Sequence, residues 1–399
     1  MARIELPAHV PADLVREFNI DYHGPLGALF PTFDSLRDEG RVLWLQTSTG
    51  QPGPYGPVPG VWIFTHGDDI RAGLQQPELF SSRFLDAGMP PMIPIFLDPP
   101  DHTRYRRLLN PLFTPAVVHT MEESIRTRFV HLIDGVRDNG GCDFVAEVAV
   151  QFPTKVFTSW IGLPEDDTGS FVAMVQQLIH TNEDVSARDT ALADAVVVVD
   201  RLIRERCAEP RDDLMSQIIA QPLDDRPLDH DELMSIAFLL FVAGLDTVVA
   251  ALSFAFWHLA GTPDDRRAVS RGTVSVDDAV EELLRCHSFL NSPRLVDHDC
   301  EFAGVALKQG DAVIFPTALA SRDPAEYDAA AEVQLDRHRN RHYAFGLGPH
   351  RCLGSHLARL EMRIALDEWH RRIPEYELAG DVQGYGGIVM GVGALPLRW

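Results

Sequence analysis

The stretch that decides the fold is FGLGPHRCLGSHLAR, residues 345–359, in which one cysteine, Cys352, precedes a segment with helical composition. Gly346, Gly348 and Gly354 allow tight turns and the close approach of a flat group. Backbone N–H groups and the dipole at a helix start favour a thiolate over a thiol. A thiolate lying against a flat face is a good axial ligand for haem iron, and that role is predicted for Cys352.

The same stretch resembles the haem-thiolate signature of the cytochrome P450 family, Phe-x-x-Gly-x-His-x-Cys-x-Gly. Phe345, Gly348, His350, Cys352 and Gly354 stand at the matching positions. The resemblance implies haem b as the cofactor and Cys352 as its proximal ligand. Phe345, Gly346, His350 and Gly354 are expected to line the haem.

A second match is EELLR, residues 281–285, in which Glu282 and Arg285 share one helix face. Such pairs are common and weak on protein surfaces, so this one carries little weight alone. The resemblance implies a buried Glu-x-x-Arg pair that is locked by Arg337. Its implied role is structural, because it would hold the cysteine loop.

A third match is AGLDT, residues 243–247, inside a long apolar segment. It resembles the oxygen-activation motif of the family. Ala243 and Gly244 would leave room for O2 above the iron, Thr247 would hydrogen-bond the bound oxygen, and Asp246 would relay the two protons that O–O cleavage needs. The alternative is an acid salt-bridged in the core beside a threonine bonded to its own helix.

A fourth match is DPPDHTRYRRLLNPLFTP, residues 98–115, in which His102 and Arg106 lie one turn apart. The resemblance implies that these two side chains bind a haem propionate and that Arg294 and His350 make the other propionate contacts. An acidic protein needs local cations to hold two carboxylates.

Composition excludes several other classes. The chain has 399 residues and a formal net charge of −23, which argues against nucleic-acid binding and against docking on anionic membranes. Five cysteines without a CxxC pair argue against a disulfide framework or a zinc site. The N-terminus lacks an apolar signal region, so a cytoplasmic location is expected. Residues 236–260 are long enough to span a bilayer, but Asp246 near the middle favours a buried core helix.

The pattern along the chain predicts a mainly α fold with a small β portion (α+β) and one domain over residues 1–399. Strands are expected within 40–66, helices over most of 103–290, short strands after 290, a helix after Cys352, and a strand or hairpin in the tail. No GxGxxG follows a strand and no P-loop occurs, so nucleotide binding lacks support. The resemblance implies the cytochrome P450 fold, with a long central helix over a haem held by a C-terminal cysteine loop.

The implied activity is that of a haem-thiolate monooxygenase, which inserts one oxygen atom from O2 into a C–H bond of a small hydrophobic, terpenoid-like substrate. A separate ferredoxin would supply the electrons. The C-terminal half resembles the bacterial camphor-hydroxylase type. That type has a substrate-binding tyrosine in the loop before DPP, but RFLDAGMPPMIPIFLDPP, residues 83–100, has none, which puts camphor itself in question. The alternatives are a peroxygenase driven by hydrogen peroxide and a non-enzymatic haem sensor or carrier.

The resemblance also implies a pocket and a docking face. The expected pocket residues are almost all apolar, with Asn291 as the polar handle: Met89, Met92, Ile95, Phe96, Leu178, Leu239, Val242, Leu290, Asn291, Ile388 and Val389. The expected docking residues for an acidic ferredoxin are all arginines: Arg71, Arg104, Arg106, Arg107, Arg339 and Arg351.

Overall fold

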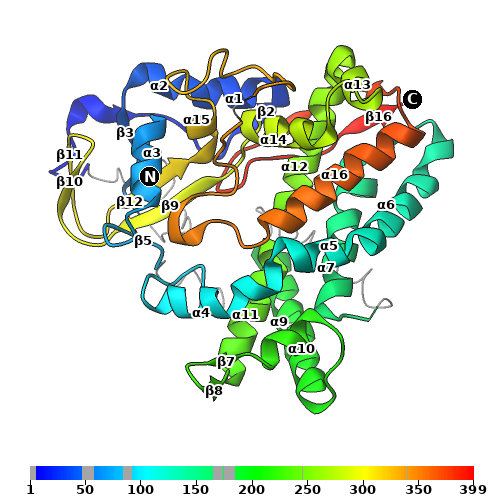
Figure 1. Ribbon diagram of the computed structural model, residues 1–399. Helices are drawn as coiled ribbons and strands as arrows, with labels where there is room; N and C mark the ends of the chain where they lie inside the picture. The colour runs from blue at the N-terminus through cyan, green and yellow to red at the C-terminus, as the bar shows by residue number, and fades with distance from the viewer. Residues whose placement is uncertain are drawn as a thin grey trace.

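The computed structural model describes residues 6–46, 58–83, 92–164, 174, 185–244, 246–338 and 340–399. Its α-helices are α1 (Leu26–Asp34), α2 (Leu36–Glu39), α3 (Gly67–Leu74), α4 (Asp101–Leu109), α5 (Pro115–Thr120), α6 (Glu122–Val136), α7 (Gln151–Ile161), α9 (Val185–Ala208), α10 (Leu214–Ile219), α11 (His230–Ala243), α12 (Asp246–Gly261), α13 (Pro263–Ser270), α14 (Val276–Cys286), α15 (Thr317–Ser321) and α16 (Ser355–Arg372). Figure 1 shows the larger helices on one side of the molecule and the main sheet on the other.

The main sheet has six strands in the order β1-β3-β4-β12-β9-β5. These are β1 (Val15–Arg16), β3 (Val42–Gln46), β4 (Gly60–Phe64), β12 (Ala312–Pro316), β9 (Asn291–Val296) and β5 (Phe80–Ser81). Strands β3 and β4 are antiparallel and pair Trp44 with Trp62. The rings of these two residues pack edge to face, with their centroids 5.1 Å apart. The predicted α+β class is therefore confirmed.

The remaining strands form small sheets at the edges of the fold. The first group is β2 (His23–Pro25), β14 (Gln383–Tyr385) and β15 (Gly391–Val392); the second is β6 (Gly141–Asp143), β13 (Glu377–Leu378) and β16 (Pro396–Arg398). Two hairpins are β7 (Pro222–Leu223) with β8 (Arg226–Pro227), and β10 (Cys300–Phe302) with β11 (Val305–Leu307). The tail predicted as a strand or hairpin thus completes sheets begun by residues near the N-terminus and in the middle of the chain.

The long apolar segment forms two consecutive helices, α11 and α12. A capping box between Asp229 and Glu232 starts α11, which ends at Gly244. Glycine is a poor helix former, and the Thr247 hydroxyl donates to the Ala243 carbonyl at 3.2 Å, so a side chain takes up this carbonyl where the helix is interrupted. By length and mean hydropathy His230–Gly261 could cross a membrane, but 65% of its most apolar window is buried inside the protein.

A second helical stretch is also divided. The pattern over residues 117–138 suggested one continuous helix, but α5 ends and α6 begins at Met121. The side chain of Thr114 caps α5 by accepting from the Val117 N–H. A new helix then starts with two glutamates, which suit the positive end of its dipole.

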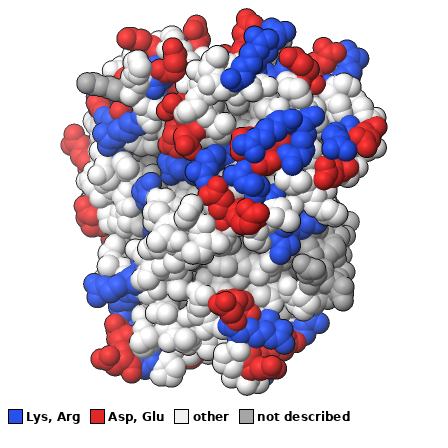
Figure 2. All heavy atoms as spheres, turned by 45° about the vertical axis from the view of Figure 1, so that its right-hand side comes forward, with Lys and Arg blue, Asp and Glu red and all other residues white. Residues whose placement is uncertain are grey.

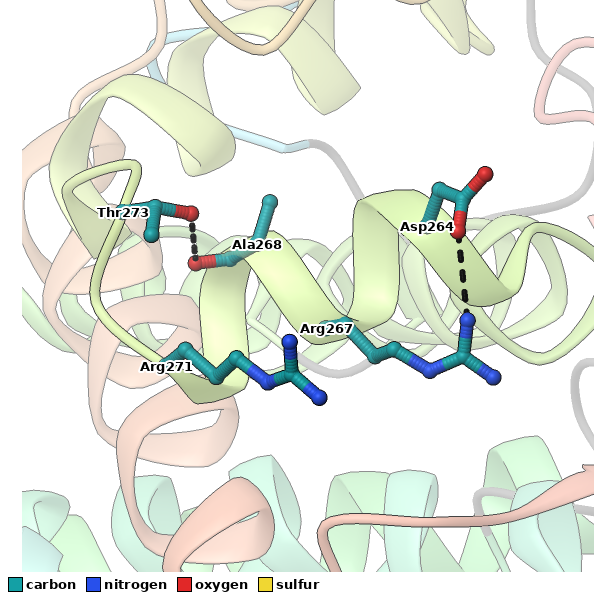
Figure 3. Close-up of a pocket in the computed structure, with 5 residues that line it drawn as sticks. All are labelled: Asp264, Arg267, Ala268, Arg271 and Thr273. Atoms are coloured by element: carbon teal, nitrogen blue, oxygen red, sulfur yellow. Dashed lines mark hydrogen bonds and ion pairs between the residues drawn. The ribbon is translucent and has the colours of Figure 1, made fainter.

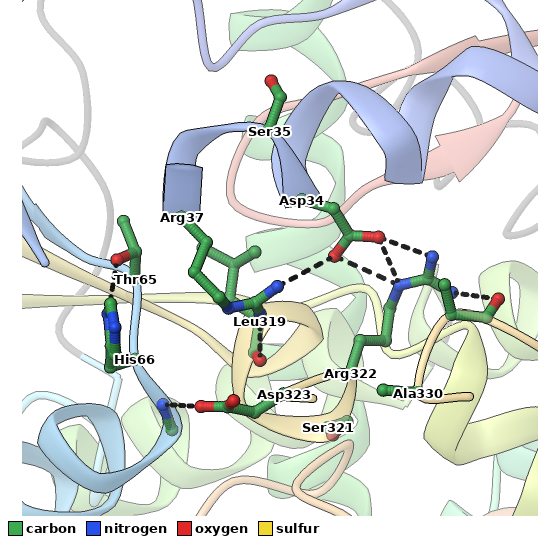
Figure 4. A network of polar contacts seen from close by, with 12 residues as sticks. Asp34, Ser35, Arg37, Thr65, His66, Leu319, Ser321, Arg322, Asp323 and Ala330 are labelled. Carbon is green, nitrogen blue, oxygen red and sulfur yellow. Dashed lines mark hydrogen bonds and ion pairs between the residues drawn. The ribbon is translucent and has the colours of Figure 1, made fainter. Parts of the chain in front are cut away.

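A buried polar network joins the sheet side of the molecule to α14 (Figure 4). Arg322, directly after α15, donates to both carboxylate oxygens of Asp34 at the end of α1, at 2.6 Å for the shortest contact, and to the Cys286 carbonyl at 2.9 Å. Asp323 accepts the Gly67 N–H at the start of α3. These bonds fix α15 against three other helices, and no sequence motif indicated them.

Another buried polar group lies on α16. Glu361 is 2% exposed, and its Oε2 has no hydrogen-bond partner among the described residues. Burial raises the pKa of this carboxyl to about 8. The folded protein therefore binds a proton here that the unfolded chain, with an ordinary glutamate, releases near pH 4.5, so Glu361 makes stability fall as the pH rises from about 4.5 to about 8.

We predict that Glu361→Gln is as stable as the wild type near pH 5 but more stable at pH 8.5, by on the order of 3 kcal/mol. The matched control is Glu368→Gln on the same helix: burial raises the pKa of Glu368, but hydrogen bonds from Arg126 and Arg372 outweigh this and lower it. That control should lose stability at neutral pH. Urea unfolding at both pH values measures the free energy of unfolding of each variant. The same difference between Glu361→Gln and the wild type at both pH values would contradict a raised pKa at Glu361.

Candidate active site

The cysteine loop is shaped by two glycines and by its own backbone hydrogen bonds. Gly346 and Gly348 have φ angles of +66° and +69°, which other residues rarely adopt. A Cβ at Gly348 would lie 2.2 Å from the Leu74 carbonyl oxygen. The Cys352 N–H donates to the Phe345 carbonyl at 2.8 Å, which closes the loop just before α16.

Cys352 is accessible to solvent, although protein surrounds it. Burial raises the pKa of its thiol, while a hydrogen bond from the Gly354 N–H and the charges of Arg106, Arg351 and Arg359 lower it. Binding to a metal ion removes the proton outright, and the N–H and the three cations then stabilise the thiolate.

The residues expected to lock this loop lie together. Glu282 and Arg285 are fully buried and form a two-point ion pair at 2.7 and 2.8 Å. Arg337 donates to Glu282 at 3.2 Å. Arg285 also donates to the carbonyls of Ser321, Ala330 and Glu332, so every remaining N–H of the pair is used inside the fold.

The link to the cysteine loop runs through Ser321. Its carbonyl accepts from Arg285, and its hydroxyl accepts from the Tyr343 N–H at 3.0 Å. The Tyr343 carbonyl in turn accepts from Gly346 at 2.8 Å. Three successive hydrogen bonds therefore connect the buried ion pair to the loop that carries Cys352.

The junction of α11 and α12 holds the predicted oxygen-activation residues. Ala243 is exposed, although most of α11 is buried. Gly244, Asp246 and Thr247 are partly buried. Burial raises the pKa of Asp246 to about 6, so this carboxyl can exchange its proton near neutral pH.

Tyr385 on β14 was missed at the sequence level. The charge of Asp246 adds to burial in raising the pKa of its phenol. Its hydroxyl lies over Gly391, where a Cβ would come within 2.2 Å, and β15 packs on α12. No spacing signal links residues 246 and 385, because only the folded sheet brings them near each other.

The predicted propionate residues gather around one point. The rings of His102 and His350 lie 4.1 Å apart, and His350 Nε2 contacts the Ser82 hydroxyl at 3.1 Å. Burial, then the charge of Arg106, lowers the pKa of His102 to about 4; burial, then the charge of Arg294, lowers that of His350 to about 2. Both histidines are thus neutral between two arginines.

This arrangement fits a haem. His102 is almost fully buried, and its Nδ1 has no hydrogen-bond partner in the described part of the chain. A buried nitrogen without a partner, among cationic groups, suits a negatively charged hydrogen-bond acceptor such as a propionate carboxylate. Arg106 donates to the Arg351 carbonyl at 3.0 Å, which ties the same group of residues to the cysteine loop.

The predicted pocket residues lie on two hydrophobic clusters. Met92, Phe96, Leu239 and Val242 belong to or pack on the cluster around α11. Val389 packs on the other large cluster, and Leu290 pairs with it in a β-bridge. Ile95 and Ile388 are exposed, at 41% and 37%. Met89 and Leu178 lie outside the described residues.

Asn291, the expected polar handle, makes a contact that the sequence did not indicate. Its side chain is fully buried, and its Nδ2 donates to the Gly387 carbonyl at 2.6 Å. The amide nitrogen therefore contacts a turn of the protein, next to the pairing of residues 289–291 with residues 388–390.

The predicted docking arginines divide into two groups. Arg71 pairs with Asp68 and Glu326, and Arg104 pairs with Asp101 and Asp224, so acids neutralise both charges. Arg107 and Arg351 are exposed and form no ion pair with a described residue. Arg106 is partly buried against the cysteine loop, and Arg339 lies outside the described residues.

A shallow surface pocket on α13 is separate from this site (Figure 3). Asp264, Arg267, Ala268, Arg271 and Thr273 line it, and none of them is a predicted site residue. Arg267 pairs with Asp264 at 3.2 Å, and the Thr273 hydroxyl donates to the Ala268 carbonyl at 3.1 Å.

Comparisons with known proteins agree with the geometry. Residues 275–369 match the family model described as cytochrome P450. The chain is 35% identical over 408 residues to probable cytochrome P450 127A1 of Sinorhizobium fredii, covering 99% of this chain and 97% of that one. The crystal structure of CYP101J2 superposes with a TM-score of 0.89 at 32% identity, covering 99% of both chains. That of CYP101C1 gives 0.89 at 31% identity, covering 99% of this chain and 100% of that one.

We predict that His102→Leu loses haem faster than the wild type. A hydrogen bond to a charged group contributes about 1.5–3 kcal/mol, which corresponds to roughly a 10- to 100-fold faster loss. Transfer of haem to apomyoglobin, followed by absorbance, measures the rate. His119→Leu on α5, an exposed histidine, is the control. Equal rates for both variants and the wild type would contradict a propionate contact at His102.

Proposed function

The chain belongs to the cytochrome P450 family, and on that premise we propose that it hydroxylates a C–H bond of a small hydrophobic, terpenoid-like substrate with electrons from a separate ferredoxin. Its general class follows from the family: it is a haem b monooxygenase and an oxidoreductase. The substrate class, the electron donor and a cytoplasmic location are the parts that we propose.

The observation that carries the proposal is the acid–alcohol pair at the start of α12. When bound, haem supplies the redox-active iron at which O2 is reduced and cleaved. Thr247 keeps its hydroxyl oriented by donating to the Ala243 carbonyl. Asp246, with a pKa raised to about 6 by burial, can take a proton from solvent and pass it inward at neutral pH.

The remaining residues bind and orient. Cys352 would hold the iron, with Phe345 and Gly354 beside it. His102, Arg106, Arg294 and His350 would hold the propionates. The two exposed isoleucines, together with the apolar residues of α11 and of the 290–389 bridge, would exclude water and favour a compact hydrophobic substrate.

The electron donor is argued from charge. A ferredoxin is acidic, so basic side chains near Cys352 would attract it, and Arg106 on α4 ties that helix to the cysteine loop. Arg107 and Arg351 offer exposed positive charge there, without an acid pairing either of them in the described chain. Basic side chains also gather on the face that α6 and α16 form (Figure 2). Several of these, such as Arg126 and Arg372, already pair with Glu368.

The intact Asp246–Thr247 pair favours this reading over a peroxygenase, because peroxide brings both oxygen atoms and needs no proton delivery to O2. Product formation from hydrogen peroxide alone, as fast as with the complete electron-transfer system, would favour the peroxygenase. A haem sensor or carrier would show no turnover with either oxidant.

We predict that Asp246→Asn lowers product formation by about 100-fold, the usual scale for loss of a positioned acid. In the wild type the rate should rise as the pH falls from 8 towards 6, because the protonated fraction of a group with a pKa near 6 rises. The variant should lose this dependence. Asp265→Asn on α13, which pairs with His258, is the matched control. Unchanged turnover and an unchanged pH profile in Asp246→Asn would rule out the relay.

We also predict that Arg107→Glu slows electron transfer from an acidic ferredoxin about tenfold at low salt, with the difference disappearing at high salt. Arg104→Glu on the same helix is the control and should have a smaller effect, because Asp101 and Asp224 already neutralise Arg104. Stopped-flow reduction measures the rate of electron transfer. A separate screen of cyclic monoterpenoids for a substrate-induced spin shift tests the proposed substrate class. A rate insensitive to salt would contradict electrostatic docking on this face.

A further inference from the structure

The turn between β14 and β15 carries Ile388, and the protein holds it from two sides. On one side, Gly386 donates to the Tyr22 carbonyl at 2.7 Å and Gly387 donates to the Ile20 carbonyl at 3.0 Å. A Cβ at Gly386 would lie 2.1 Å from the Ile20 oxygen, and Gly387 has a φ angle of +115°. The turn is thus fixed against the N-terminal segment and tolerates no larger residue there.

On the other side, Asn291 holds two successive carbonyls of the same turn. Its backbone N–H donates to the Ile388 carbonyl at 2.8 Å, and its Nδ2 donates to the Gly387 carbonyl at 2.6 Å. A carbonyl only accepts hydrogen bonds, so the amide nitrogen must face Gly387. That orientation leaves Oδ1 buried without a partner among the described residues.

The unpaired Oδ1 of Asn291 helps to explain why an asparagine stands at this position. A buried acceptor without a partner costs free energy, and an apolar residue of the same size would avoid that cost. Stability alone therefore does not favour asparagine at this position. What asparagine adds is the donor to Gly387, which fixes the peptide directly before Ile388.

Ile388 is the residue that gains a fixed position. Its side chain is 37% exposed, while the next residue, Val389, packs on the core and bridges to Leu290. An exposed apolar side chain on a rigid backbone is suited to contact a hydrophobic ligand.

We propose that Asn291 is a positioning residue for substrate specificity: by holding the Gly387 and Ile388 carbonyls, it sets where the Ile388 side chain meets the substrate. This inference rests on the proposed function, because it assumes a haem-bound pocket that takes a hydrophobic ligand. It assigns the specificity to a contact that Asn291 makes with the protein rather than with the substrate.

The test uses two azoles on the haem-loaded protein. Imidazole reaches the iron with little contact beyond it, whereas 4-phenylimidazole also carries an apolar ring into the pocket. For Asn291→Leu we expect the Kd of 4-phenylimidazole to rise on the order of fivefold to tenfold, with the Kd of imidazole changing less than about twofold. The Soret shift on titration measures both values.

A double-mutant cycle separates positioning from general destabilisation. Ile388→Ala should weaken 4-phenylimidazole to a similar degree, and adding Asn291→Leu to it should have little further effect, because both act through one side chain. Tyr376→Phe, which removes a buried hydrogen bond to His370 elsewhere, is the stability control and should change neither Kd. Asn291→Asp keeps the shape of the side chain but removes the donor to the Gly387 carbonyl. This variant replaces Asn291→Leu in both experiments if the leucine variant does not fold.

Additive effects in the cycle, or an unchanged selectivity between the two azoles in both Asn291 variants, would overturn the inference while leaving the proposed function intact. Failure of the wild type to shift its Soret band with either azole would overturn both, because the pocket would then not open onto an iron. A parallel loss of both azoles in Asn291→Leu would assign Asn291 to haem binding and reject the specificity role.

Discussion

The rest of the site depends on the buried ion pair between Glu282 and Arg285. Neither side chain is exposed, and a buried charge left without its partner costs about 3–5 kcal/mol. The pair is tolerated because every further donor of Arg285 finds a carbonyl of the segment between Ser321 and Glu332. That segment has no regular structure after Ser321, so the bonds from Arg285, together with those of Arg322 and Asp323, hold it in place. Through Ser321 and Tyr343 the same network fixes the start of the cysteine loop.

Charge then determines what the interior can hold. The chain is strongly acidic overall, yet His102, Arg106, Arg294 and His350 converge at one place inside it. Burial and the charges of Arg106 and Arg294 keep both histidines neutral, and a pair of carboxylates would offset the two arginine charges. Asp246, at the start of α12, is a desolvated acid. The residues proposed for anion binding and for proton exchange therefore lie on different elements.

Much of this could be predicted from the sequence, because it depends on local spacing. The cysteine loop, the Glu-x-x-Arg pair and the Ala-Gly-x-Asp-Thr stretch each lie within a few residues of one another, and the strand and helix periods gave the α+β class. Arg322, Tyr385 and Asn291 could not be predicted in the same way. Arg322 meets Asp34 and Asn291 meets Gly387 only through sheet pairing and helix packing, because the partners are 288 and 96 positions apart in the sequence. Ion pairing also depends on the fold: the sequence offered Arg104 as a docking charge, and only the β7–β8 hairpin places Asp224 beside it.

The central claim is that Cys352 binds the haem iron as a thiolate. The measurement that tests it most directly is the absorption spectrum of the dithionite-reduced protein under carbon monoxide. The account predicts a strongly red-shifted Soret band that moves to shorter wavelength in Cys352→His, since a neutral nitrogen ligand donates less charge to the iron. A short-wavelength band in fresh, folded wild-type protein would mean a neutral ligand and would contradict the account.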